Sequence, residues 1–135
     1  MKEFEEIYDV MILGTGPAGL QAAIHASRRK VSVVILGREH KSSAYGVHVE
    51  NYCCISGVTG QEMISEGRRN ARDSGALFVD EDITELGRDG ELFQAHTESG
   101  STIRSRAVIL AMGISRKKVG VPGEKEFVGK GLSYC

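Results

Sequence analysis

Continuously hydrophobic stretches alternate with amphipathic ones in the first third of the chain, and this pattern predicts strands separated by a helix. Tyr8–Leu13 and Val31–Leu36 are apolar over almost their whole length, which is typical of parallel strands covered on both faces. Between them, apolar and small residues recur every three or four positions over Pro17–Arg29, which predicts a helix with one buried face. Together these elements predict a right-handed βαβ unit.

The pattern predicts a second helix after a long irregular segment. Residues 41–58 have no clean periodicity, so we expect a loop there. Thr59 and Glu62 have the spacing of a capping box, in which each side chain bonds the other residue's backbone amide. We expect the helix to begin at this box, to carry its arginines, including Arg68, on the solvent side, and to end at Gly75.

The last part of the pattern predicts short strands. Leu77–Val79 supplies a short third strand. Ile83–Leu86, Leu92–Thr97 and Thr102–Arg104 alternate apolar with polar residues between Asp-Gly and Ser-Gly turn pairs, which predicts an antiparallel meander. Ala107–Ala111 is again continuously apolar and indicates a return to the parallel sheet. The expected fold is therefore α/β, a Rossmann-like parallel sheet with an appended antiparallel β-meander.

Composition narrows the function classes. The 135 residues are 41% hydrophobic and carry 17 Lys and Arg against 18 Asp and Glu, a net charge of -1, which gives no basic field for nucleic acid. The apolar runs are far shorter than the roughly 18 residues of a membrane span, and acidic residues occupy the start where a secretory leader carries positive charge. We therefore expect a cytoplasmic protein with neither a nucleic-acid nor a membrane partner.

The cysteines and histidines do not indicate a metal site. Three cysteines are an odd number, so a structural disulfide framework is not expected. The four histidines form no cluster with metal-ligand spacing, and we expect no bound metal.

A glycine motif follows the first predicted strand and opens the first predicted helix, where a G-x-G-x-x-G sequence binds a dinucleotide. The first glycine makes the tight turn, the second lets a pyrophosphate approach the backbone, and the third allows close packing of helix on strand. The helix start attracts the anion with its unpaired amides. The alternative is a merely Gly-rich turn. The six residues are Gly14, Thr15, Gly16, Pro17, Ala18 and Gly19.

Two charged residues follow the second predicted strand. Glu39 comes 20 residues after Gly19, where a carboxylate accepts hydrogen bonds from an adenosine ribose diol. Its neighbour Arg38 is able to accommodate a 2'-phosphate instead, so the pair leaves NAD-type and NADP-type adenosine open. A solvated surface position is the alternative for both side chains.

Several motifs occur in the order in which one family carries them. They are Gly14–Gly19, Gly37–Glu39, Val49–Tyr52, Ala111–Ser115 and Val121–Glu124 followed by Gly129–Cys135. On these motifs, and over about residues 7–135, the chain resembles the N-terminal FAD-binding part of low-molecular-weight thioredoxin reductases and related pyridine nucleotide-disulfide oxidoreductases.

The resemblance implies an FAD site. Its pyrophosphate is expected on residues 14–18, its adenosine ribose at Glu39 and its flavin side within reach of Asn51. The backbone of Ile83 matches the position that meets the adenine. Ala111 and Gly113 match small residues beside the cofactor, where a flat ring system needs close approach.

The resemblance also implies an activity. A FAD-dependent oxidoreductase of this kind passes electrons from NAD(P)H through FAD to a redox disulfide that includes Cys135, and then to a thioredoxin-like protein disulfide. On this likeness, residues 1–135 form an FAD-binding segment that ends at the first redox cysteine and is inactive alone, and homodimerisation is expected from the resemblance only.

Two alternatives stay open. The first alternative is a noncatalytic nucleotide-binding module or split subunit that needs a partner chain. The second is a related FAD oxidoreductase with another electron donor, such as ferredoxin or a deazaflavin. Lys41–Ala44 replaces the family's Gly-Gly-Gln stretch, which keeps the second alternative open.

The chain departs from the family at two further places. Met112 replaces the usual Thr and removes a hydroxyl. Cys53 and Cys54 stand where the family commonly has Pro and Gly. Adjacent cysteines close only a strained disulfide ring, so we expect exposed thiols or small buried residues, without a catalytic role.

Overall fold

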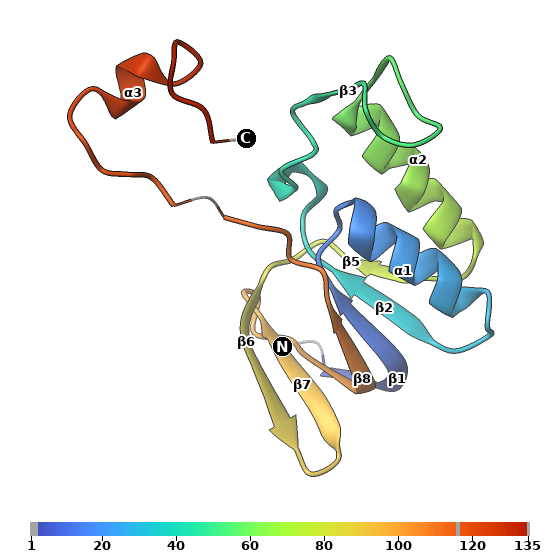
Figure 1. The fold of residues 1–135 in the computed structure, drawn as a ribbon. Coiled ribbons are helices and arrows are strands. Elements are labelled where there is room, and N and C mark those ends of the chain that lie inside the picture. Colours follow the sequence, from blue (N-terminus) through green and yellow to red (C-terminus); the bar gives the residue numbers. More distant parts are fainter. Residues whose placement is uncertain (1–2, 116, 135) are drawn as a thin grey trace.

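The computed structural model describes residues 3–115 and 117–134, and its centre is a six-stranded sheet with two helices on one face (Figure 1). The strands lie in the order β5-β2-β1-β8-β7-β6. Their bounds are β1 Glu3–Leu13, β2 Val33–Leu36, β5 Leu77–Val79, β6 Ile83–Asp89, β7 Leu92–Thr97 and β8 Thr102–Leu110. The α/β class and the Rossmann-like arrangement are thereby confirmed.

The predicted βαβ unit is confirmed. β1 pairs in parallel with β2, for example Met11 with Val34. Between them α1 (Pro17–Ser27) buries Leu20, Ala23 and Ser27, whose three- and four-residue spacing matches one helix face.

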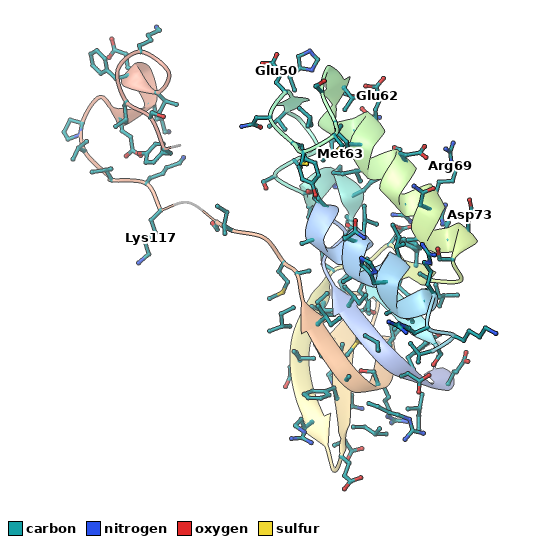
Figure 2. The ribbon with its side chains drawn as sticks, turned by 45° about the vertical axis from the view of Figure 1, so that its right-hand side comes forward. Glu50, Glu62, Met63, Arg69, Asp73 and Lys117 are labelled. Carbon is teal, nitrogen blue, oxygen red and sulfur yellow. The ribbon has the colours of Figure 1, made fainter. Side chains whose placement is uncertain are left out.

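The capping box that begins α2 (Gly60–Asp73) is also confirmed. The Thr59 hydroxyl accepts from the Glu62 amide at 3.2 Å, and the Thr59 amide donates to the Glu62 carboxylate at 2.8 Å. Gly75 has a φ of 104°, the left-handed conformation that ends helices. Figure 2 shows Glu62 and Met63 at this capped end of α2, with Arg69 and Asp73 further along the helix.

The solvent-side prediction for Arg68 was wrong. Arg68 is 8% exposed, and its guanidinium lies 4.4 Å from the centre of the Phe78 ring. It also pairs with Asp80. Aromatic stacking and an acidic partner compensate the burial of its charge.

The meander is confirmed, but it shares a strand with the parallel sheet. β7 pairs antiparallel with β6 and with the first half of β8, while β8 pairs in parallel with β1 along its length. The two segments expected at 102–104 and 107–111 are therefore one strand, Thr102–Leu110.

The loop at residues 41–58 is mostly irregular, as predicted, but it contains a small antiparallel pair. A short 3-10 helix, η1 (Glu39–Lys41), leads into it. β3 (His48–Val49) then pairs with β4 (Val58–Thr59) directly before α2.

The C-terminal described residues lead away from the sheet (Figure 1). They carry the short helix α3 (Glu124–Phe127). The Glu124 carboxylate accepts from the amide of Gly120 at 2.7 Å and from the Tyr134 hydroxyl, so this segment folds back on itself. Among the residues that the structure describes, no helix is both long and apolar enough to cross a membrane.

Candidate nucleotide-binding site

A cavity of about 580 Å³ opens at the carboxyl ends of β1, β2 and β8. Ligands of open α/β sheets bind at this edge. Five short segments line the cavity: residues 13–18, 36–38, 41–43, 81–83 and 110–114.

The glycine turn after β1 is so tightly packed that two of its positions exclude any side chain. Gly14 has a φ of 115°, and a Cβ there would lie 2.2 Å from the Ala111 carbonyl oxygen. A Cβ on Gly19 would lie 1.9 Å from the Gly14 carbonyl oxygen. Real Cβ atoms do not approach backbone so closely, so β1, α1 and β8 can meet here only with glycine at both positions.

Gly16 differs from Gly14 and Gly19 because neither its backbone conformation nor a contact with other backbone requires glycine. Its φ is -77°, which any residue adopts. A Cβ there would lie 3.0 Å from the Ser42 hydroxyl, in the space between the turn and the loop at residues 41–43. No side chain caps α1, and the first turn of a helix leaves its amides without intrahelical partners. The turn therefore offers backbone donors and the positive end of the helix dipole to an anion.

Charged side chains lie at the other end of the cavity. Glu81 accepts hydrogen bonds from the hydroxyls of Thr97 and Ser99, and these bonds lower the pKa of its carboxyl, with Arg38 contributing further. Arg38 pairs with Glu98.

Two polar atoms at this end have no hydrogen-bond partner. Glu81 Oε2 and Arg38 Nε are both buried and unpartnered. Leaving a buried acceptor and a buried donor unpaired is costly. Hydrogen bonds from a ligand to these atoms would therefore make its binding more favourable. A glycine-rich turn with an anion-binding helix start at one end, and unpaired polar groups at the other, fit a dinucleotide.

Most of the residues expected at the site line the cavity. Gly19 lies beneath the turn instead and packs against Gly14. The expected residues that line the cavity are Gly14, Thr15, Gly16, Pro17, Ala18, Arg38, Ile83, Ala111 and Gly113.

Glu39 and Asn51 are not brought to this cavity. Glu39 lines a neighbouring cleft of about 770 Å³, where its carboxylate lies 3.8 Å from Arg68 Nη1. Arg38 lines both spaces, so Glu39 stands just behind the cavity edge. Asn51 is exposed on the loop. Cys135 falls outside the described residues.

Five polar residues that line the cavity were not among the expected site residues, namely Lys41, Ser42, Ser43, Glu81 and Asp82. Glu81 and Asp82 come soon after β5, a parallel strand whose carboxyl end meets the same sheet edge as that of β1. That rule could have identified both carboxylates. The three loop residues Lys41, Ser42 and Ser43 follow no such rule, and only their place in the stretch that replaces the family's Gly-Gly-Gln drew attention to them.

Comparison with known proteins identifies similar chains. A family model described as pyridine nucleotide-disulphide oxidoreductase matches residues 8–135. The chain is 39% identical over 133 residues to a thioredoxin reductase of Bacillus subtilis (strain 168), covering 97% of this chain and 42% of that protein. It is 35% identical over 138 residues to the bifunctional thioredoxin reductase/thioredoxin of Mycobacterium leprae (strain TN), covering 97% of this chain and 29% of that protein.

A solved structure agrees with the fold. The atypical thioredoxin reductase TRi from Desulfovibrio vulgaris Hildenborough superimposes with a TM-score of 0.73 at 36% identity, over 95% of this chain and 43% of that one. The chain thus spans less than half the length of the proteins that it matches.

Proposed function

Because the chain belongs to the pyridine nucleotide-disulphide oxidoreductase family, we propose that it is the FAD-binding part of a flavoprotein disulfide reductase of the thioredoxin reductase type. The observation that carries the proposal is the cavity at the sheet edge, bounded by a turn that admits no side chain at Gly14. Its shape and its donors suit the adenosine diphosphate half of FAD.

Different residues of the cavity are proposed to bind different parts of FAD. The backbone of residues 14–18 and the start of α1 bind the diphosphate. Ile83 meets the adenine through its backbone, and Ala111 and Gly113 allow the cofactor to approach β8. Asn51 is assigned to the flavin side by the family likeness.

The adenosine ribose is assigned to the acidic end of the cavity. Glu39 keeps the role implied by its distance from the glycine motif, although its carboxylate faces Arg68. Glu81, whose Oε2 is buried and unpartnered, provides a second carboxylate at this end. Arg38 lines both spaces, and its charge helps to lower the pKa of the Glu81 carboxyl.

The electron path is proposed from the family alone. When bound, FAD supplies the chemistry that carries electrons between NAD(P)H and a disulfide. Cys135 is the proposed redox cysteine, a thioredoxin-like protein disulfide is the proposed substrate, and the complete protein is proposed to be a homodimer. The names of the two curated relatives support the choice of thioredoxin.

A single glycine substitution tests FAD binding and requires only the Ser42 side chain to move. Gly16→Val places a side chain in the cavity wall at a backbone φ of -77°, which valine adopts readily. The matched control is Gly87→Val on β6, where a Cβ meets nothing within 4 Å and the φ is not left-handed. FAD affinity is measured by quenching of flavin fluorescence, and circular dichroism verifies folding.

We expect the wild type and Gly87→Val to bind FAD equally, and Gly16→Val to bind it at least about tenfold more weakly, a loss of about 1.4 kcal/mol. The proposal fails if the purified wild-type protein neither carries nor takes up FAD, or if folded Gly16→Val binds it as tightly as the control does.

A further inference from the structure

Cys53 and Cys54 occupy the two central positions of a tight turn between β3 and β4. Tyr52 and Ile55 flank them as an isolated antiparallel bridge, and the Ile55 amide donates to the Tyr52 carbonyl at 3.0 Å. Neither thiol lines the proposed nucleotide cavity. The pair is therefore a separate feature of the surface.

The backbone at Cys54 adopts an unfavourable conformation for its residue type. Its φ is 65°, and a turn with positive φ at the third residue favours glycine there. A side chain in the left-handed region is strained. Strain of this kind clusters at functional sites, and the strained residue here holds its thiol 3.6 Å from that of Cys53.

The two sulfurs are arranged for a bridging atom rather than for a direct bond. Both thiols are free and exposed, and their Sγ atoms are 3.6 Å apart. A disulfide requires about 2.05 Å between sulfurs and a Cα separation of at least about 4.4 Å, whereas consecutive Cα atoms are only about 3.8 Å apart.

Bridging by a third atom needs little movement of the sulfurs. Consider one soft atom bound to both sulfurs at about 2.3 Å, the length of a zinc–thiolate bond. With the sulfurs at their observed separation of 3.6 Å, the sulfur–atom–sulfur angle is about 103°. That angle is close to tetrahedral. Closing the two sulfurs to a disulfide distorts the turn, and capturing a soft atom between them does not.

The surroundings limit the ligand to one that needs two protein sulfurs. Over residues 3–115 and 117–134, no group of three or more His, Cys, Asp and Glu side chains is arranged to hold a metal ion. Thiolates select soft centres. Trivalent organic arsenicals are soft and have two exchangeable positions, which matches the number of thiols.

We propose that Cys53 and Cys54 form a vicinal dithiol site that binds trivalent arsenicals. The arsenic–oxygen bond of an arsenoxide breaks, two arsenic–sulfur bonds form, and the two thiol protons leave with the oxygen as one molecule of water. Arsenic and sulfur keep their oxidation states, so the step needs neither an oxidant nor a reductant.

Phenylarsine oxide is the probe. We expect an adduct mass on the proteolytic peptide that contains residues 53 and 54, with both titratable thiols of that peptide lost per adduct. Dithiothreitol should reverse the adduct, whereas an equal thiol concentration of 2-mercaptoethanol should not, because only a dithiol competes with a chelate.

Cysteine variants separate this site from other thiols. Cys54→Gly removes one sulfur and relieves the positive φ, so the fold is retained and we expect affinity for phenylarsine oxide to fall at least tenfold. Cys53→Ser should behave likewise, and Cys135→Ser should keep the adduct at residues 53 and 54. The proposal is overturned if that peptide carries no adduct in the wild type, or if Cys54→Gly binds the probe as tightly as the wild type.

Discussion

At Arg68 on α2, the residue type and its position along the helix predict opposite degrees of burial. Ile64, Arg68 and Ala71 are all buried, at the spacing of one helix face. The spacing alone therefore places Arg68 inward, but its charge led to the opposite prediction. The Phe78 ring, with Asp80 on β5's carboxyl side, supplies the stacking and the acidic partner that make the inward position stable.

Replacing Arg68 tests the value of this arrangement. Arg68→Met keeps the aliphatic packing but leaves Glu39 and Asp80 without their cation. Their side chains are 34% and 61% exposed and remain hydrated, so we expect a loss of about 1–2 kcal/mol in the free energy of unfolding, between the values for exposed and buried pairs. Urea denaturation measures it.

The matched control for this change is Arg69→Met, next along the same helix. Its side chain is 68% exposed and pairs with Glu66, so its loss should stay below about 1 kcal/mol. Equal losses in the two variants would mean that the buried pair adds nothing to stability.

The sequence predicted the positions of the glycines at the site better than those of the charged side chains. Gly19 is required by its contact with the Gly14 carbonyl inside the βαβ unit, and Gly14 by its φ of 115° as well as by the Ala111 carbonyl after β8. The turn itself therefore contains most of the needed information. The direction of the Glu39 carboxylate depends on Arg68, which lies 29 positions later in the chain and on another element. A pattern read along one segment does not contain that contact.

At the level of elements, local signals predicted helix ends and missed the continuity of β8. The capping box and Gly75 fixed both ends of α2. In β8 the polar run at residues 104–106 suggested a break. Ser105 is nevertheless fully buried, and its hydroxyl donates to the carbonyl of Ala107 at 2.9 Å, so the strand satisfies its own polar group and continues.

The capping box of α2 makes the stability of this element depend on pH. Hydrogen bonds from the amide and then the hydroxyl of Thr59 hold the pKa of Glu62 below its usual 4.5. The unfolded chain therefore binds a proton more readily at this residue. The stabilisation is present above the unfolded pKa and is lost as the pH falls through the folded one.

We expect the wild type to melt at a higher temperature than Glu62→Gln near neutral pH, and the gap to close as the pH falls below about 4.5 and through the lowered pKa of Glu62. Thermal melts followed by circular dichroism measure the gap. Glu66→Gln, one turn further along and without a bond to Thr59, is the control. A gap between the wild type and Glu62→Gln that is independent of pH would contradict the linkage.

In the whole molecule, the sheet separates two apolar clusters, and one of them joins the parallel and antiparallel parts. On the helix side, Ile12 and Val33 pack with α1 and α2. On the other side, Met11 and Val34 pack with Ala95 and Ile103 of the meander. The strands of both parts, apart from the continuity of β8, were predictable from their own composition. The sharing of one cluster by both parts was not, because it follows from the strand order, which places β8 between β1 and β7.

This shared cluster predicts that the two parts unfold together. Ile103 is fully buried in it, so Ile103→Ala should cost about 2–5 kcal/mol in the free energy of unfolding. Hydrogen exchange measured peptide by peptide should then show amides of β2 and of β7 losing protection by the same factor, because both open only in the global transition. Ile109→Ala, on the same strand but 38% exposed, should cost less than about 1.5 kcal/mol and reduce protection correspondingly less. If Ile103→Ala exposed β6 and β7 while β2 kept its protection, the meander would be an independently unfolding unit, and the cavity at the carboxyl ends of β1 and β2 would owe nothing to its packing.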